Sequence, residues 1–439
     1  MSQSAQRGDQ GIIPSALTPA HAQNTDPVAA SDAPNPSDEN ASVERAVPTA
    51  EIELKLLGNR EQLADFVSSP AIPQYARDAG VNTDLIATYY DTPDFALRKS
   101  GAVLRVRTDG QRFVMTLKSA SRADGKTLER TEWKAPVQCM EPDLAALSQF
   151  LPAETFAQVE GAQLKPVFTT EVRRHTRMLD IPLGTVKLAV DQGRIVAGER
   201  TEEINEIELE LMDGSTAAVF QLAQDLASTT ALRPSIRSKS ARGFDLALGN
   251  PPQITKAPKM KFDHGATLDQ VLDGILRSAL QHLMESQPAA EDGQNPEGIH
   301  QYRVALRRLR SVLGLMRSIG PSSQLDASRD DAKWLMSNFN DARDWDVFIT
   351  ETLPPISQAC PAVEGFDVLK RAAEEHRHKA HDKARAAITD PRTGRFQIAL
   401  GLWGEQAGWR AGARKVWGCW PHRPAVSRQE FWRSYTAKS

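Results

Sequence analysis

Residues 51–56 read EIELKL, and this stretch decides the fold. Its charged residues, Glu51, Glu53 and Lys55, alternate with three apolar residues. Because successive side chains of a β-strand point to opposite faces, the stretch predicts a strand with one charged and one apolar face. On its own, the pattern is also typical of an edge strand whose charged face meets solvent.

The same alternation recurs in the segments that follow, which are bounded by Gly, Asp or Pro. Strand character is found at residues 49–56, 84–92, 102–108, 112–120, 127–135, 168–179, 185–193 and 204–211. Residues 60–80, 141–160 and 214–230 have helical character. Eight strands with few helices predict an antiparallel barrel or closed sheet.

Charged residues of several strands stand in phase on one face. They include Lys55, Arg105, Arg107, Lys118, Arg130, Glu132, Lys187, Glu206, Glu208 and Glu210. If helices cover the apolar face, these charges line the barrel, where unpaired charges would be very costly without water, metal and an anion. Lys and Arg donate to phosphate oxygens, and Glu oxygens suit Mg²⁺ or Mn²⁺, so the pattern favours a chain of phosphates as ligand. In the opposite register the charges would face solvent.

The second half of the chain has helical periodicity. Residues 249–261 contain Pro and Lys and indicate a linker. Apolar spacings of three and four then predict helices at residues 267–286, 298–318, 330–350 and 366–388. On residues 298–318, the basic side chains His300, Arg303, Arg307 and Arg310 share one face, which could equally be a solvated face.

The length and overall composition of the chain limit its class of protein and its location in the cell. The chain has 439 residues, a formal net charge of −3 and 25% charged residues, which argues for two domains and against bulk attraction to nucleic acid or anionic membranes. Three cysteines without CxxC spacing argue against a disulfide framework. The absence of a signal-like apolar run and of a long apolar window predicts a cytoplasmic protein. Residues 1–47 are predicted to be a disordered leader, and residues 411–439 an irregular tail.

Five motifs occur in order: EIELK at 51–55, YYDT at 89–92, LRVR at 104–107, EIELEL at 206–211 and SKSARG at 238–243. Together they resemble the CYTH superfamily, over residues 48–248. The resemblance implies an α+β fold in which an eight-stranded antiparallel barrel with flanking helices forms a triphosphate tunnel open at both ends.

The resemblance also implies roles for individual residues. Catalytic residues would be Glu51, Glu53 and Lys55; metal ligands would be Glu51, Glu53, Glu208, Glu210 and Asp191. Substrate-binding residues would be Lys55, Arg105, Arg107, Lys118, Arg130, Arg174, Lys187, Lys239 and Arg242, with Arg173 as an alternative to Arg174. Glu132 and Glu206 are interpreted as salt-bridge partners of neighbouring basic residues.

The segments HQYRVALRRLRSVL at 300–313 and FNDARDWDVF at 339–348 resemble CHAD domains, which are helical bundles that bind polyphosphate. Polyphosphate-binding residues would be His300, Arg303, Arg307, Arg308 and Arg310, with Asp344 and Asp346 capping or orienting these arginines. A second basic helix is not found after residue 391, so residues 262–410 are interpreted as a partial CHAD domain left by a frameshift or truncation.

The implied function is metal-dependent hydrolysis of inorganic triphosphate to diphosphate and phosphate, with Mg²⁺ or Mn²⁺, and the CHAD-like region favours the bacterial inorganic triphosphatases. Two relatives by fold are alternatives: a class IV-type adenylate cyclase and a thiamine triphosphatase. An alternative of another class is a non-catalytic polyphosphate-binding protein. The four glutamates at 51, 53, 208 and 210 disfavour it, because pure anion binding gains nothing from buried carboxylates.

Overall fold

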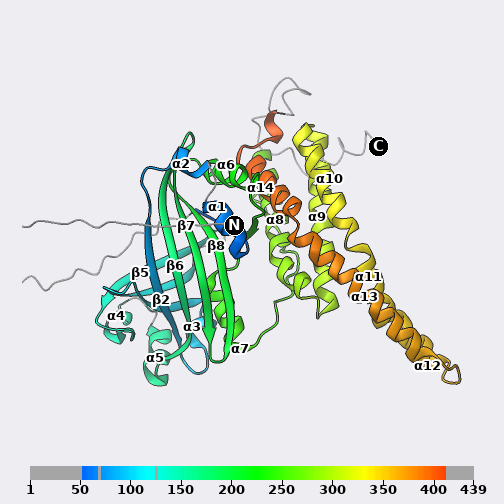
Figure 1. Cartoon of the computed structure of the whole chain (residues 1–439), viewed down its shortest axis with the longest axis horizontal. Coiled ribbons are helices and arrows are strands. Elements are labelled where there is room, and N and C mark those ends of the chain that lie inside the picture. Colours follow the sequence, from blue (N-terminus) through cyan, green and yellow to red (C-terminus); the bar gives the residue numbers. More distant parts are fainter. Residues whose placement is uncertain (1–51, 68–70, 124–126, 150, 152, 412–439) are drawn as a thin grey trace, which may run out of the picture. The chain divides into compact units, whose positions relative to one another are not determined.

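The computed structural model of the chain describes residues 52–67, 71–123, 127–149, 151 and 153–411. These residues form an antiparallel sheet with helices, followed by a helical region (Figure 1). The predicted leader and residues 412–439 of the predicted tail lie outside the described residues. Among the helices described, none combines the length and the apolar character needed to cross a membrane.

A nine-stranded antiparallel sheet forms the first region. Its strands are β1 (Glu53–Leu57), β2 (Val81–Asp91), β3 (Ala102–Thr108), β4 (Phe113–Ala123), β5 (Thr127–Val137), β6 (Lys165–Ile181), β7 (Gly184–Ala197), β8 (Arg200–Gly214) and β9 (Arg233–Ser235). They lie in the order β5-β4-β3-β2-β6-β7-β8-β1-β9. Figure 1 shows β2, β6, β7 and β8 side by side.

The α+β class and the antiparallel sheet are confirmed, but the eight-stranded closed barrel is wrong. A ninth strand pairs with β1, and the edge strands β5 and β9 have no hydrogen-bonded partner on their outer sides among the described residues. β9 escaped prediction because it has only three residues, and its central Pro234 has no backbone N–H to donate.

The register of the strands gathers charged side chains on one face, called here the charged face. Residues directly opposite each other on neighbouring strands project to the same side. Lys55 lies opposite Glu208, Glu208 opposite Ala189 on β7, and Asp191 opposite both Glu206 and Arg174. Arg174 therefore belongs to the charged face, whereas the adjacent and exposed Arg173 does not.

The opposite face of the sheet is covered by helices. These are α1 (Arg60–Val67), α2 (Ala71–Tyr75), α3 (Ala96–Lys99), α4 (Leu144–Leu147), α5 (Ala153–Ala162) and α6 (Thr216–Ala227). Leu56, Ile207 and Leu209 are fully buried in one cluster with Leu222 and Leu226 of α6. Because each fully buried Leu or Ile stabilises by about 1.5–3 kcal/mol, this burial fixes which face is apolar and which is charged.

A further helix, α7 (Lys239–Leu248), packs on the charged face at the end where β6 begins and β7 ends. Its buried Phe244 contacts Phe168 of β6 edge-to-face, with 5.2 Å between ring centroids. Gly243 lies against the same ring, because a Cβ there would be 2.1 Å from Phe168. Apolar residues of α7 thus cover this end of the charged face, and polar residues line the remainder.

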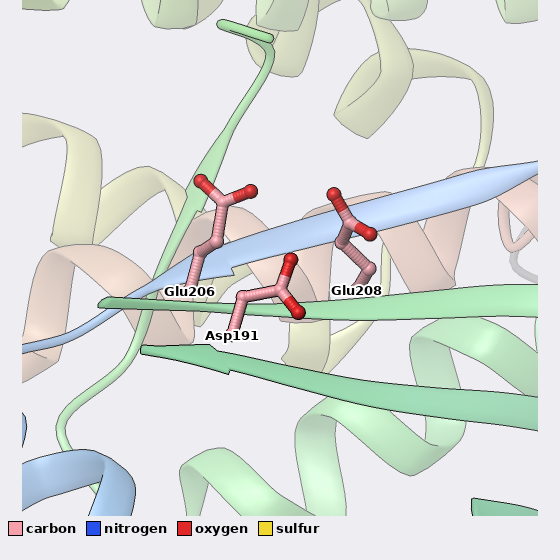
Figure 2. Close-up of side chains that lie close together, drawn as sticks. All are labelled: Asp191, Glu206 and Glu208. Atoms are coloured by element: carbon pink, nitrogen blue, oxygen red, sulfur yellow. The ribbon is translucent and has the colours of Figure 1, made fainter. Parts of the chain in front are cut away.

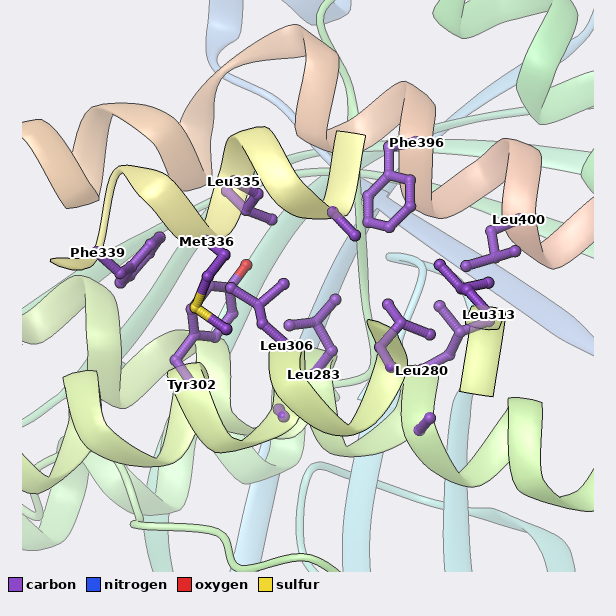
Figure 3. Close-up of a cluster of buried hydrophobic side chains, with 14 of the residues drawn as sticks. Leu280, Leu283, Tyr302, Leu306, Leu313, Leu335, Met336, Phe339, Phe396 and Leu400 are labelled. Carbon is purple, nitrogen blue, oxygen red and sulfur yellow. The ribbon is translucent and has the colours of Figure 1, made fainter. Parts of the chain in front are cut away.

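The second region is all-α, as predicted. Its helices are α8 (Leu268–Asp292), α9 (Pro296–Ile319), α10 (Ser323–Ser337), α11 (Asn340–Val347), α12 (Leu353–Ala359), α13 (Phe366–Thr389) and α14 (Pro391–Glu405), with a π-helical turn at Phe348–Thr352. The helix expected over residues 330–350 is divided between α10 and α11 near Phe339, whose side chain is fully buried. Figure 3 shows the shared core, which includes Leu283, Tyr302 and Leu306.

Candidate active site

Three carboxylates meet on the charged face. Asp191 of β7 and Glu206 and Glu208 of β8 each offer an oxygen, and these oxygens all lie within 4.8 Å of one another (Figure 2). Asp191 and Glu206 are completely buried. Carboxylate oxygens are hard ligands that suit Mg²⁺ or Mn²⁺, so the donor set fits the metal that the sequence implies.

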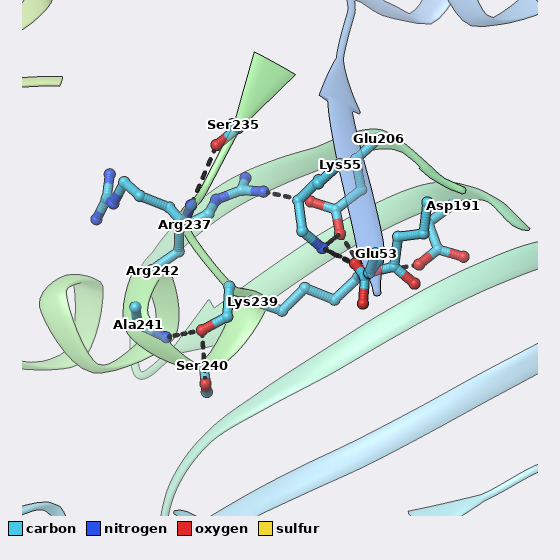
Figure 4. A network of polar contacts seen from close by, with 12 residues as sticks. Glu53, Lys55, Asp191, Glu206, Ser235, Arg237, Lys239, Ser240, Ala241 and Arg242 are labelled. Carbon is cyan, nitrogen blue, oxygen red and sulfur yellow. Dashed lines mark hydrogen bonds and ion pairs between the residues drawn. The ribbon is translucent and has the colours of Figure 1, made fainter. Parts of the chain in front are cut away.

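Basic side chains from separate elements surround these carboxylates. Lys55 of β1 lies 2.6 Å from Glu208 and 3.0 Å from Glu206. Lys239 of α7 lies 2.6 Å from Asp191 and 2.9 Å from Glu208, and it also contacts Glu206. Figure 4 shows both lysines converging on the carboxylates from different elements.

Two arginines complete this network. The guanidinium of Arg174 donates to both oxygens of Asp191, at 2.7 and 2.6 Å, and to Glu208 at 2.6 Å. Arg242 of α7 donates to Glu202 at 2.7 Å and to Glu206 at 3.2 Å. Buried charges are tolerated when they are paired and hydrogen-bonded in this way.

Pairing keeps these groups ionised. Burial opposes ionisation of Glu208, but Lys239, Lys55 and Arg174 outweigh it and hold the pKa of this carboxyl well below its ordinary range. Burial likewise opposes the charge on Lys239, yet Glu208, Asp191 and Glu206 raise its pKa. The site therefore holds fixed charges of both signs.

Glu53 and Glu210 form a second acidic pair, whose negative charges are less fully compensated by basic side chains. They lie directly opposite each other on β1 and β8, an arrangement in which like charges destabilise a sheet. Burial raises the pKa of Glu53, and the negative charge of Glu208 raises it further. Glu210 lies 2.7 Å from Lys187, while Lys55 is 3.4 Å from Glu53. A divalent cation beside this pair would relieve the repulsion, which supports the fit to a metal.

Arg105 and Arg107 of β3 differ from the other basic residues. Among the described residues, neither forms an ion pair with a carboxylate, and Arg105 Nε is buried without a hydrogen-bond acceptor. Burial lowers the pKa of Arg107, and the positive charges of Arg105 and Arg174 lower it further. Two half-buried guanidiniums therefore share a positive potential that an anionic ligand would neutralise.

The remaining predicted residues divide into two groups. Lys118 lies 3.4 Å from Glu132, whose pKa is lowered because Lys118 and Lys134 outweigh the effect of burial. This contact agrees with the salt-bridge interpretation of Glu132. Glu51 and the side chain of Arg130 lie outside the described residues.

Glu206 was interpreted only as a salt-bridge partner, but it is also one of the three residues of the carboxylate cluster. It accepts from Lys55, Lys239 and Arg242 as well, so both descriptions hold. The position of Glu206 in the cluster could have been predicted from the sequence, because Glu206 stands in phase with Glu208 on the same strand.

In the helical region, one of the predicted basic residues of α9 points away from the others. Arg307 and Arg310 are exposed, and Arg303 donates to Asn340 of α11. Arg308 instead points to α8, where it donates to the backbone and hydroxyl oxygens of Ser278. Arg308 is one position away from Arg307 on a helix and so rotated by about 100° from it. Its assignment to polyphosphate binding stays a prediction.

Asp346 also differs from the expectation. Its carboxylate accepts from Arg377 at 2.6 Å and from His381 at 2.9 Å, both on α13. Within the described residues it has no contact with the arginines of α9. Asp346 is completely buried, so it fastens α11 to α13 within the bundle. Asp344 contributes to the electrostatic environment of Arg303.

One face of the antiparallel sheet carries clustered carboxylates together with basic residues, and a helical bundle follows the sheet. A sheet of this kind defines a class of domain that is suited to a metal ion and a phosphate anion. Residues 49–244 match the family model of the CYTH domain, and residues 274–435 match that of the CHAD domain. The chain therefore carries a CYTH domain followed by a CHAD domain. The second match continues into the segment interpreted as an irregular tail.

Several known proteins are similar to parts of the chain. An inorganic triphosphatase from Haemophilus influenzae is 30% identical over 197 residues, which are 44% of this chain and 54% of that protein. The chain spans about half the length of the curated relatives it matches. The crystal structure of the CHAD domain from the plant Ricinus communis has 28% identity and a TM-score of 0.34, covering 42% of this chain and 57% of that chain. A Bacillus halodurans protein has 23% identity and a TM-score of 0.31, covering 44% and 96%.

Proposed function

We propose that the chain hydrolyses inorganic triphosphate to diphosphate and phosphate with Mg²⁺ or Mn²⁺. The observation that carries this proposal is the pair Arg105 and Arg107, which lie half-buried on the same face as the carboxylate cluster. In the part of the chain that the structure describes, neither forms an ion pair with a carboxylate. Such a face needs an anion beside the two arginines and a cation beside the carboxylates. The 30% identity to an inorganic triphosphatase over the sheet region supports the same substrate.

Each group of residues has a distinct task in this reaction. Arg105, Arg107 and Lys118 bind the phosphate chain by charge-assisted hydrogen bonds and hold it in line for attack. Glu53, Glu208 and Glu210 hold the divalent cation, with Asp191 and Glu206 behind them. When bound, the cation neutralises charge that develops on the phosphate oxygens.

Water is the attacking group, so the protein needs to orient it and accept its proton. Glu53 is the candidate base, because its side chain belongs to the acidic pair beside the cluster and is 37% exposed, so that solvent water reaches it. The water oxygen bonds to the terminal phosphorus, the bond from that phosphorus to the bridging oxygen breaks, and diphosphate leaves with the bond electrons. The proton passes through Glu53 to solvent. Lys55 and Lys239 stabilise the increased negative charge.

For the helical region we propose binding of polyphosphate at the exposed side of α9. Burial lowers the pKa of Arg303, and the neighbouring charges of Arg307 and Arg343 lower it further although Asp344 opposes them. Positive charge is therefore concentrated here, with Arg310 and His300 on the same helix. A linear polyanion would neutralise several of these groups at once.

Phosphate release by the full chain tests the main proposal. Inorganic triphosphate, ATP, thiamine triphosphate and long polyphosphate are compared, each with Mg²⁺, Mn²⁺ or EDTA. We expect the highest kcat/KM with inorganic triphosphate and loss of release in EDTA. Glu53→Gln should abolish turnover, while Arg194→Met, on the opposite face of the sheet and exposed, should not.

The alternatives predict different products. Formation of cyclic AMP from ATP in preference to release from triphosphate would replace the proposal with a cyclase. Preference for thiamine triphosphate would change the substrate. Tight binding of inorganic triphosphate without release from any substrate would indicate a non-catalytic binding protein.

A further inference from the structure

The YYDT motif at residues 89–92 has no part in the reaction proposed above, although it lies next to β3. The carboxylate of Asp91 is completely buried and accepts the backbone N–H groups of Thr92, Leu97 and Arg98 at 2.8, 2.9 and 3.0 Å. The hydroxyl of Thr92 accepts the N–H of Ala96 at 2.8 Å. These polar atoms are used to fold the single turn of α3, which fixes the position of Arg98.

Arg98 then reaches across to α7. Its Nη2 lies 3.2 Å from Asp245 Oδ1, and its guanidinium carbon lies 5.0 Å from the centre of the Phe244 ring. The other oxygen of Asp245 accepts from Arg237 at 2.8 Å. Asp245 is thus held between two arginines, one before α7 in the chain and one on α3. Its side chain is only 16% exposed, so solvent screens these pairs less than surface pairs.

The helix held in this way carries two residues of the candidate active site. Lys239 is the first residue of α7, after its N-cap Ser238, and Arg242 lies one turn further on. Asp245 is six residues beyond Lys239, about 9 Å along the helix axis. A helix moves as a rigid element over this length, so a shift at Asp245 moves the lysine and the arginine together.

We propose that Asp245 is a positioning residue, which through Arg98 and Arg237 sets where α7 presents Lys239 and Arg242 to the carboxylate cluster. The inference deepens the proposed function and rests on it. Among the described residues, Asp245 pairs with Arg98 and Arg237 and with no residue of the carboxylate cluster. Its contribution is to orientation, which matters because displacements of about 1 Å in a catalytic group can reduce turnover a hundredfold.

Steady-state kinetics of the full chain with inorganic triphosphate and Mg²⁺ test this role. Asp245→Asn keeps the shape of the side chain and removes its charge, and we expect kcat/KM to fall about tenfold or more. Arg98→Met should reproduce the loss, and Arg98→Lys should restore part of it. Asp180→Asn is the matched control, because Asp180 also pairs with an arginine but is half exposed and lies on another element.

A double-mutant cycle separates positioning from general destabilisation. In a Lys239→Met background, Asp245→Asn should have a much smaller effect on kcat/KM than in the native chain, because coupled residues are not additive. Equal effects in both backgrounds, or a kcat/KM within twofold of the native value, would overturn the proposal. Thermal unfolding of each variant shows that it is folded.

Calorimetric titration with inorganic triphosphate distinguishes failure of this inference from failure of the proposed function. If the native chain binds triphosphate without turnover, the hydrolase proposal fails, and weaker binding by Asp245→Asn still supports positioning. If Asp245→Asn binds and turns over like the native chain, only the positioning role fails. If the native chain neither binds nor hydrolyses triphosphate, both are refuted.

Discussion

Replacing Arg105 with methionine should make the protein more stable and less active. The guanidinium Nε of Arg105 is buried without an acceptor, and such a donor costs about 1–3 kcal/mol. Arg107 lies two residues along the same strand, about 6.6 Å away. Two unit charges at that distance repel by about 2.5 kcal/mol when the effective dielectric constant is near 20. Methionine removes both costs and keeps most of the side-chain volume.

Part of this gain is offset by the attraction between Arg105 and Glu132, which the substitution also removes. We therefore expect the free energy of unfolding to rise by about 1 kcal/mol, which raises Tm by about 2–4 °C for a domain of this size. Loss of a charge-assisted hydrogen bond to phosphate costs about 1.5–3 kcal/mol. The corresponding fall in kcat/KM is about ten- to a hundredfold.

Arg174→Met is the contrasting variant. Arg174 is paired with Asp191 and Glu208, so its removal leaves buried carboxylates with less compensation and should destabilise by about 3–5 kcal/mol. Thermal unfolding without ligand and phosphate release from triphosphate are measured for both variants. A lower Tm for Arg105→Met, or a kcat/KM within twofold of the native value, would refute the assignment of Arg105 as an unpaired anion-binding group.

Other substitutions test separate parts of the structure. Glu208→Gln should abolish phosphate release and leave the chain folded, as circular dichroism would show; retention of native turnover in Mg²⁺ contradicts the metal assignment. Tyr302→Phe should leave Tm unchanged or raise it by a few degrees, because the buried hydroxyl of Tyr302 has no hydrogen-bond partner, and a clear fall in Tm would show that one exists. Burial raises the pKa of Asp346, but His381 and Arg377 outweigh it and hold the pKa below its ordinary value. The stabilisation is therefore present above the ordinary pKa of an aspartate and is lost as the pH falls through the lower pKa of the folded state. In acid unfolding, Asp346→Asn should lack this pH-dependent part of the stability. A pH profile equal to that of the native chain would argue against this role of Asp346.

Much of the sheet could be predicted because charged and apolar residues alternate over long segments. The strand at residues 204–211 lies within β8, and its three glutamates face one side as the period of two requires. The three-residue β9 and the four-residue α3 could not be predicted, since neither is long enough to show a period. Closure of the sheet depends on hydrogen bonds between strands far apart in sequence, which local patterns do not determine.

The candidate site was predictable to a similar degree. Phase along a strand places Glu208 and Glu210 on one face, and the same argument includes Glu206. The pairing of individual carboxylates with Lys55, Arg174 and Lys239 depends on which strands are neighbours, and this is set by topology. In the helical region, the division between α10 and α11 was missed because the apolar spacing continues through Phe339.

The cover that α7 forms over one end of the charged face has a consequence for chain length. If the charged face binds a linear phosphate chain as proposed, that chain approaches from the uncovered direction with its terminus leading, because Phe244 and Phe168 fill the end that α7 covers. The scissile bond then lies at a fixed depth from the leading end. Any longer polymer that is accepted should be trimmed from its ends, giving a ladder of slightly shortened chains on a gel, whereas fragments of half length would mean that chains thread past the helix.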